Sequence, residues 1–347
     1  MDVRLSPEQV ALRDSAAQVV DRLGVHRVAD LDDRERTAKL DAAVSASGWR
    51  EIRTATDDGA PWASAVEVAV VAEELGRGLA DVAFLGPTLA AEFRRRTGAP
   101  AAAEPETVAL TADLVQPATD ESGMVPPGAV AIDARGPATA LVLVGAADGY
   151  AIGSAALEGG AVGIDLTRAT VSWPAREPVA AVDGQTRSLR PDDMATWRSL
   201  GLAVTSADLV GVMRGALTLT TDYARDRRQY GTAIGSFQAV QHLLADAFVA
   251  MEGSRSIALH AAWAVDALPG PAALSAASAA KAYCARAARS VCETAIQVHG
   301  GIGNTWDCLA HVFLRRALLS SDVLGGVGPS LARVLAARGM GGDDGLR

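Results

Sequence analysis

The sequence predicts an α+β protein, mostly α. An N-terminal helical domain, a small central β barrel or sandwich and a C-terminal antiparallel helix bundle are expected in that order. Three observations predict it. The first hundred residues carry helix start and stop signals, the next segment breaks into short apolar runs, and long apolar helical stretches then return. We therefore expect domains at residues 1–100, 106–190 and 192–340.

Composition sets the limits of this prediction. A chain of 347 residues with 49% hydrophobic and 21% charged residues can bury a large core in two or three domains. The net charge of −9 disfavours a nucleic-acid partner. The three cysteines have neither metal-ligand spacing nor an even count, so we expect reduced thiols, no metal site and a cytoplasmic protein. No secretion signal and no uninterrupted membrane-length apolar run is seen, so no membrane is expected.

The N-terminal segment opens with a compact helix start signal. Ser6 is placed to cap a helix, Pro7 suits its first turn, and Gln9 completes a capping box. Further helices are expected at about 37–47, 61–75 and 87–95, with glycines after the first two acting as stops. The proline- and alanine-rich residues 97–105 are interpreted as a linker.

The central segment contains five short apolar runs separated by Gly, Pro and Asp. Such spacing is typical of the strands of a small barrel or sandwich. The runs lie at 107–110, 129–132, 140–144, 150–152 and 169–173.

The C-terminal segment predicts long helices joined by short turns, which is the pattern of an antiparallel bundle. The expected helices lie at 192–226, 236–267, 271–298, 308–320 and 328–338.

A basic cluster lies where the first bundle helix is expected to end. Arg225, Arg227 and Arg228 precede Gly231, which fits a left-handed helix stop, and Ser236 fits the N-cap of the next helix. An arginine fork beside a helix N-terminus can hold a phosphate. On this stretch alone we favour the simpler interpretation, a helical hairpin whose arginines pair with surface acids.

A second motif changes that balance. Residues 295–306 read AIQVHGGIGNTW, an apolar helix that runs into a glycine-rich turn. Together the two motifs resemble the acyl-CoA dehydrogenase family, which carries R-x-Q-F/Y-G … F-Q-x-x-Q followed by Q-x-H/F-G-G-x-G. The resemblance is clear over about residues 200–320 and weaker over the first 90. The matching residues are Arg227, Gln229, Tyr230, Gly231, Phe237, Gln238, Gln241, Gln297, His299, Gly300, Gly301 and Gly303.

The resemblance implies oxidation of the Cα–Cβ bond of an acyl-CoA, with a carboxylate as the base and FAD as the hydride acceptor. The family places its base at one of two positions. Counting back from Arg227 places the first at or near Gly201, and the second falls on Leu324; neither residue is a carboxylate. Asp307 and Asp322 are the remaining candidate bases, although a helix N-cap or first-turn role suits Asp307 better.

The resemblance also divides the expected flavin contacts into two halves. The family's T-E-P … G-S loop and W-I-T/S strand, which hold a chain's own flavin, are absent between residues 106 and 190. The retained residues are those that reach a neighbour's FAD. Arg227 would bind the pyrophosphate, Phe237 and Gln238 would flank the adenosine, and Gln229 and Tyr230 belong to the same motif. Gln297, Gly300 and Gly301 would complete this half of the site.

The leading hypothesis is therefore a partner subunit of a heteromeric acyl-CoA dehydrogenase of lipid metabolism, of the α2β2 type. It would complete the FAD site of a homologous full-length subunit. Three alternatives stay open: a self-sufficient homo-oligomer that uses Asp307 or Asp322 as base, a non-catalytic scaffold or binding relative of the fold, and an unrelated helical interaction module.

Overall fold

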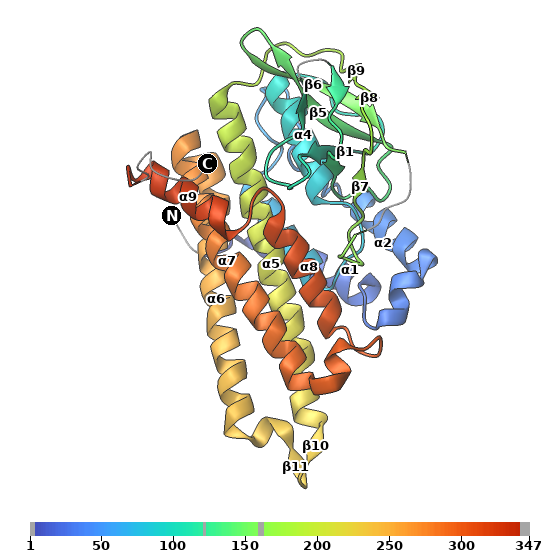
Figure 1. The fold of residues 1–347 in the computed structure, drawn as a ribbon, viewed down its shortest axis with the longest axis vertical. Coiled ribbons are helices and arrows are strands. Elements are labelled where there is room, and N and C mark those ends of the chain that lie inside the picture. Colours follow the sequence, from blue (N-terminus) through green and yellow to red (C-terminus); the bar gives the residue numbers. More distant parts are fainter. Residues whose placement is uncertain (1–3, 121–122, 159–162, 341–347) are drawn as a thin grey trace.

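The computed structural model describes residues 4–120, 123–158 and 163–340. A bundle of long helices forms the elongated body, and a small β domain lies at one end, against the N-terminal helices (Figure 1). The mostly helical architecture with a small central sheet confirms the expected fold class.

The N-terminal helices match their sequence signals. The Ser6 hydroxyl accepts from the backbone N–H of Gln9 at 3.2 Å, and the Gln9 side chain accepts from the backbone N–H of Ser6 at 3.0 Å, which confirms the capping box. The helices are α1 (Pro7–Leu23), the short 3-10 helix η1 (Val28–Asp32), α2 (Arg34–Ala46), α3 (Ala65–Arg77) and α4 (Leu85–Thr97).

One glycine in this region has a different role from the one expected. Gly76 does not stop α3; it lies inside the helix, and a Cβ there would collide with the backbone oxygen of Asp208 on α5 (Pro191–Asp226). Gly211 faces the backbone of Glu73 in the same way. These glycines therefore let α3 and α5 approach closely, which sequence spacing alone did not reveal.

The β domain has two apolar faces. Leu141 and Leu143 of β5 pack into the core shared with the helices, whereas Ala140 and Val142 face a second core together with Val125 of β3. In the described residues, the main sheet has the order β7–β4–β1–β5–β6–β9, with β2 also on β5, and β3 pairs separately with β8. The strands are β1 (Glu106–Leu110), β2 (Thr119–Asp120), β3 (Met124–Val125), β4 (Val130–Ala131), β5 (Thr139–Ala146), β6 (Gly149–Ala156), β7 (Val171–Ser172), β8 (Glu177–Pro178) and β9 (Ala180–Ala181).

The bundle helices lie within one or two residues of their expected positions. They are α5, α6 (Gln238–Ala267), α7 (Gly270–His299), α8 (Ala310–Asp322) and α9 (Val327–Ala337). By length and composition α5 could cross a membrane, but 94% of its most apolar window is buried inside the protein. It is the central helix of the bundle, and its apolar character follows from that burial.

The link between α5 and α6 differs from the expected helical hairpin. Helix α5 ends at Asp226, before Gly231. Tyr230 and Gly231 have φ of 52° and 82°, and they form the turn of a small hairpin between β10 (Arg228–Gln229) and β11 (Thr232–Ala233). Two successive left-handed residues are the geometry of a tight hairpin turn, so the glycine signal was real and its interpretation as a helix stop was wrong.

The expected N-cap of α6 is also wrong. Ser236 belongs to a short 3-10 turn, η2 (Ile234–Ser236), and its hydroxyl donates to the carbonyl of Ala233 at 2.7 Å. Phe237 occupies the N-cap position without a side-chain cap. Because the serine hydroxyl satisfies the turn, it is not available to the helix.

Candidate functional site

The two sequence motifs meet at the end of the bundle that lies farthest from the β domain (Figure 1). The ring of Tyr223, near the end of α5, stacks on the ring of His299, the last residue of α7, with centroids 4.4 Å apart. His299 is buried, and its Nδ1 lies 2.7 Å from the carbonyl oxygen of Ala295. This imidazole therefore holds a helix end and joins the two motifs into one surface.

The arginines of the first motif are not equivalent. Arg225 pairs with Asp222 at 2.5 Å and also approaches Asp226, as the simpler interpretation predicted. Among the described residues, no acid pairs with Arg227 or Arg228, and both are exposed. Two unneutralised guanidinium groups at the end of a helical bundle are suited to bind an anion.

The other motif residues present an open surface around these arginines. A Cβ added at Gly231, Gly300 or Gly301 would meet nothing within 4 Å, so the glycine backbone is accessible. All the residues that we expect to reach a neighbour's FAD lie on this surface and are exposed. These residues are Arg227, Gln229, Tyr230, Phe237, Gln238, Gln297, Gly300 and Gly301.

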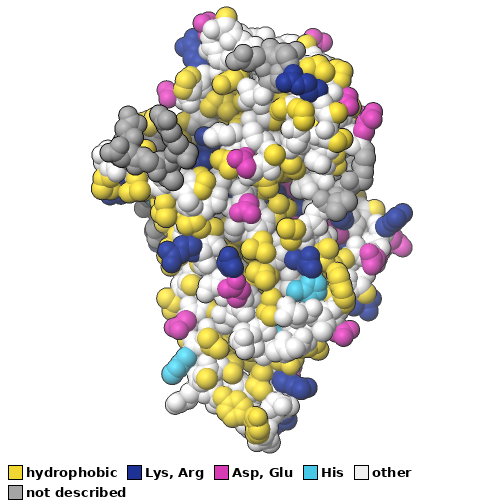
Figure 2. Space-filling view, in the orientation of Figure 1, with side chains coloured by type: hydrophobic (Ala, Val, Ile, Leu, Met, Phe, Trp, Pro, Cys, Tyr) yellow, Lys and Arg dark blue, Asp and Glu magenta, His cyan; other side chains and the backbone are white. Residues whose placement is uncertain are grey.

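Large apolar side chains are exposed next to the motif. Tyr230 is 95% exposed, and Trp306, Phe248 and Val249 are each more than half exposed. Figure 2 shows hydrophobic side chains gathered at this end of the molecule. Exposed aromatic and aliphatic groups at this density indicate a surface that another protein covers. Arg227 and Arg228, the accessible glycine backbone and the apolar side chains around them together suit the phosphate and adenosine part of a dinucleotide.

The two positions at which the resemblance leads us to expect the family's catalytic base meet inside the protein. A Cβ on Gly201 of α5 would collide with Cδ1 of Leu324, and it would lie 3.4 Å from Cδ2 of Leu89. Leu324 is fully buried, and its backbone N–H donates to the carbonyl of Leu114 in the β domain at 2.7 Å. Its φ of 63° is left-handed, which is unusual for a leucine.

This contact decides whether the chain's own half of a flavin site fits the cofactor. The space between the two base positions is occupied by the Leu324 side chain, and the turn that carries it is bonded directly to the β-domain loop at Leu114. The residues present place no carboxylate there, and a side chain at position 201 would require the Leu324 side chain to move. The described residues at this interior position therefore offer no base to an acyl thioester.

The two candidate bases lie elsewhere. Asp307 is exposed in the loop between the 3-10 helix η3 (Gly300–Asn304) and α8. The N-cap of α8 is Leu309, so the expectation that Asp307 caps or begins this helix is wrong. Asp322 is the exposed last residue of α8. Neither is buried with Gly201 and Leu324.

A buried group of charges joins the β domain to the bundle, and sequence reasoning did not find it. Asp208 on α5 binds Arg316 at 2.6 Å, and Arg168 binds Asp133 at 2.7 Å. Ser320 links the two pairs, because it donates to Asp208 at 2.6 Å and accepts from Arg168 at 3.0 Å. The only sequence signal was the lone acid Asp208 in an otherwise apolar part of α5.

Lys281 on α7 lies next to this group and is fully buried. Its Nζ donates to the Thr205 hydroxyl and to the carbonyl of Val323, both at 3.0 Å, and to the carbonyl of Ser320. Burial and the nearby Arg168 lower the pKa of Lys281 to about 7. The lysine thus fixes the end of α8, immediately before Leu324.

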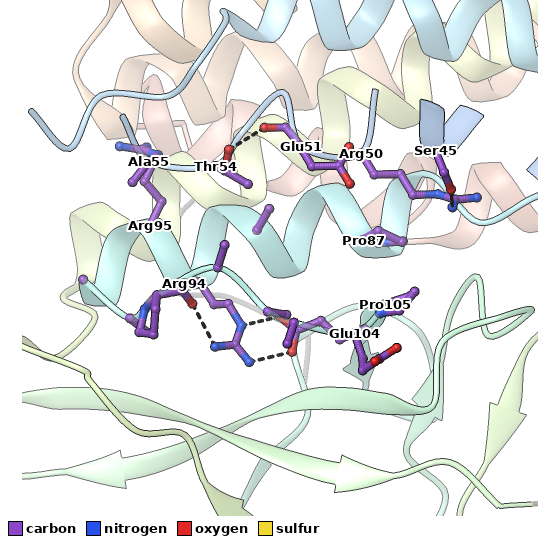
Figure 3. Close-up of a pocket in the computed structure, with 18 residues that line it drawn as sticks. Ser45, Arg50, Glu51, Thr54, Ala55, Pro87, Arg94, Arg95, Glu104 and Pro105 are labelled. Atoms are coloured by element: carbon purple, nitrogen blue, oxygen red, sulfur yellow. Dashed lines mark hydrogen bonds and ion pairs between the residues drawn. The ribbon is translucent and has the colours of Figure 1, made fainter. Parts of the chain in front are cut away.

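A separate groove of about 460 Å³ lies between α4, the segment around residues 45–55 and the linker at 98–106 (Figure 3). Arg94 in its wall binds Glu106 at 2.5 and 2.9 Å and the carbonyl of Pro100 at 3.0 Å. Arg50 is likewise bonded to Asp41 and to the carbonyl of Ala83. Because these cations are already satisfied, we assign the groove no ligand.

Comparison with known proteins identifies relatives of the chain. The model of the C-terminal domain of acyl-CoA dehydrogenases matches residues 201–339. Acyl-CoA dehydrogenase IpdE2 of Mycobacterium tuberculosis is 32% identical over 266 residues, which cover 74% of this chain and 73% of that protein. Acyl-CoA dehydrogenase FadE34 of the same organism is 41% identical over 137 residues, which cover 40% of this chain and 19% of FadE34.

Two solved structures share the fold over nearly the whole chain. The Tcur3481–Tcur3483 steroid ACAD aligns with a TM-score of 0.79 and 22% identity, covering 96% of this chain and 98% of that one. A chain of the ChsE4–ChsE5 complex from Mycobacterium tuberculosis aligns with a TM-score of 0.75 and 24% identity, covering 99% of this chain and 100% of that one.

Proposed function

This chain belongs to the acyl-CoA dehydrogenase family, and from that premise we propose that it is the partner subunit of a heteromeric, FAD-dependent acyl-CoA dehydrogenase. In this role it contributes the across-interface half of an FAD site to a full-length subunit. The full-length subunit supplies the base and binds the acyl-CoA. The reaction is the oxidation of a CH–CH bond of an acyl thioester in lipid metabolism, and we expect the complex in the cytoplasm.

The observation that carries this proposal is the contact between Leu324 and Gly201. Both positions that could provide a base in this fold are apolar, and the side chain of one fills the space in front of the other. A base must reach the α carbon of the substrate, and nothing at these positions can accept its proton. The chain's own half of the site is therefore assigned no catalytic role.

The opposite end of the bundle supports the positive part of the proposal. Arg227 and Arg228 are exposed and lack an acidic partner among the described residues, so they are available for the pyrophosphate of an FAD held by the neighbour. Phe237 and Gln238 would flank its adenosine, while the Gly300–Gly301 backbone approaches its phosphates. When bound, FAD supplies the hydride acceptor; this chain's residues bind and orient it.

The proposed pairing of unlike chains also has a precedent among the structural neighbours. Two structural neighbours are described as paired chains, Tcur3481–Tcur3483 and ChsE4–ChsE5. The exposed apolar side chains beside the motif give this chain a surface on which a homologous subunit could pack. We infer a dimer or heterotetramer in which each FAD is shared between unlike chains.

Purification of the chain alone tests the proposal. We expect a colourless protein without dehydrogenase turnover, and a yellow, active complex when the full-length partner is co-expressed. An isolated chain with stoichiometric FAD and turnover would refute it. Loss of that turnover in Asp322→Asn or Asp307→Asn would then assign a relocated base. If the co-expressed pair also lacked FAD, the scaffold alternative would replace the proposal.

A further inference from the structure

A small cavity lies inside the protein where the N-terminal helices, the β domain and the bundle meet. Its volume is about 20 Å³, and every residue that lines it is more than nine-tenths buried. Its apolar wall comes from α3, from the segment 82–85 and from Val204 of α5. The polar residues that line it are Asp133, Arg168, Thr205, Asp208 and Arg316. The cavity is therefore closed to solvent and yet lined by charged groups.

One nitrogen of the Arg168 guanidinium is left over in this wall. Nε of Arg168 donates to Oδ1 of Asp133 at 2.7 Å, and Nη1 donates to the Ser320 hydroxyl at 3.0 Å. The Ser320 hydroxyl donates in turn to Oδ2 of Asp208 at 2.6 Å. Because Asp133 and Asp208 both line the cavity, these bonds hold the guanidinium in its wall. The remaining nitrogen, Nη2, is buried and bonds to no protein group in the described part of the chain.

The carboxylates beside this nitrogen can still accept hydrogen bonds. Among the described residues, Oδ1 of Asp133 accepts only from Arg168, and Oδ2 of Asp208 accepts only from Ser320. Each carboxylate oxygen has two lone pairs, so both can accept once more. A buried charged donor without a partner is costly. A ligand that suits the cavity must therefore accept from Nη2 and donate to the carboxylates.

We propose that the cavity is a binding site for one water molecule, which accepts from Nη2 of Arg168 and donates to Asp133 and Asp208. A single water needs about 10–15 Å³ of such space and two to four polar partners, and the cavity supplies both. Two carboxylates and two guanidinium groups line it, so their charges balance and a neutral ligand is favoured over an ion.

The bound water completes the buried group of charges that joins the β domain to the bundle. It gives Arg168 of the β domain a further link to Asp208 of α5, besides the link through Ser320. A water bridge of this kind is enthalpically close to a direct hydrogen bond. The site is separate from the exposed arginines at the far end of the bundle, and it stands whether or not the subunit proposal holds.

A high-resolution crystal structure of the full chain, with bromide replacing chloride in the buffer, tests the site directly. We expect one density peak at about 2.7–3.2 Å from Nη2 of Arg168, without the anomalous signal of bromide. A bromide signal at this position would show that the ligand is an anion and would overturn the proposal. A cavity without a density peak would also overturn it.

Two matched substitutions on α5 test the water in solution. Val204 lines the cavity, whereas Val212 is equally buried among apolar side chains farther along the helix. Replacing valine by threonine adds one hydroxyl at nearly constant size. In Val204→Thr this hydroxyl can bond to the water, whereas in Val212→Thr only the helix backbone is available to it.

Thermal unfolding of the two variants is the measurement. We expect the melting temperature to fall in Val212→Thr by about twice as much as in Val204→Thr, because only the second hydroxyl keeps a water partner. Equal decreases, or a larger decrease in Val204→Thr, would indicate a dry cavity and would overturn the proposal.

Discussion

The side chain of Leu324 occupies the space that a side chain at position 201 would need. The two residues are 123 positions apart in sequence, and each stands at or near a position where we expect the family's catalytic carboxylate. Their contact means that the interior position of the base has become part of the hydrophobic core. We propose that the chain has kept the fold of the enzyme, while this contact fills the position at which its base is expected.

This contact predicts a specific coupling between two substitutions. Gly201→Ala should destabilise the protein by about 1–3 kcal/mol, because the added methyl group overlaps Leu324. Leu324→Ala should cost about 2–5 kcal/mol through the cavity it leaves. The double variant should be more stable than the sum of these losses predicts, because the new methyl group enters the new cavity. Urea unfolding of the four proteins measures this coupling, and strict additivity would argue against the contact.

A buried carboxylate joins the N-terminal helices to the bundle. Glu92 of α4 binds Arg53 at 3.1 Å and binds Arg95 and Arg96 at 2.6 Å each, and Arg53 in turn binds Asp266 of α6 at 3.0 Å. Burial alone would raise the pKa of Glu92, but these arginines lower it to about 2.

Acid unfolding should therefore depend on Glu92. Its pKa is lower in the folded protein than in the unfolded chain, so its contribution is complete above about pH 4.5 and is lost as the pH falls toward 2. Glu92→Gln should lower the free energy of unfolding by about 3–5 kcal/mol at neutral pH, since it leaves buried arginines unpaired. It should also make the free energy of unfolding depend less on pH in the acid range. Glu293→Gln, in a surface pair, is the control and should change neither. An unaltered acid transition in Glu92→Gln would contradict this role.

The buried Lys281 predicts that stability depends on pH in the neutral to alkaline range. Its pKa falls from 10.5 in the unfolded chain to about 7 in the folded protein, so the unfolded state binds more protons between these values. Stability should consequently rise as the pH increases from about 7 toward 10. Lys281→Met should remove this rise. It should also lower the free energy of unfolding, because the hydrogen bonds to Ser320 and Val323 are lost. Denaturant unfolding across this pH range is the measurement, and the same slope in both proteins would rule out Lys281 as its source.

Much of the architecture was predictable from sequence, because the signals that define each helix lie close together in the chain. The bundle helices are long, apolar and bounded by Pro and Gly, so length and periodicity defined them to within a residue or two. The Ser6 capping box was equally clear because all its parts lie within four residues.

The errors and omissions concern residues whose role depends on distant neighbours. From sequence alone, Gly76 is interpreted as a helix stop, whereas in the structure it lies against Asp208. Gly231 is interpreted in the same way, whereas in the structure it shares a left-handed conformation with Tyr230. The partners of Lys281 lie on α5 and at the end of α8. In the same way, sequence identified Leu324 and Gly201 as missing bases but could not show that one fills the space of the other.

The surface at the far end of the bundle predicts a separable effect on cofactor binding. Arg227→Gln in the co-expressed complex should weaken FAD binding by about tenfold while leaving assembly intact, because an exposed charge-assisted contact is lost without a change in packing. Arg225→Gln is the matched control, since Arg225 already pairs with Asp222. Fluorescence titration of the apo-complex with FAD gives the affinities, and equal losses in the two variants would contradict the assignment.

The most direct measurement is the ratio of FAD to polypeptide in the purified complex with the full-length partner. If this chain completes the partner's site and its own site is closed by Leu324, the complex holds one FAD for each pair of unlike chains. One FAD for every chain would mean that this subunit holds a flavin of its own, and it would contradict the account.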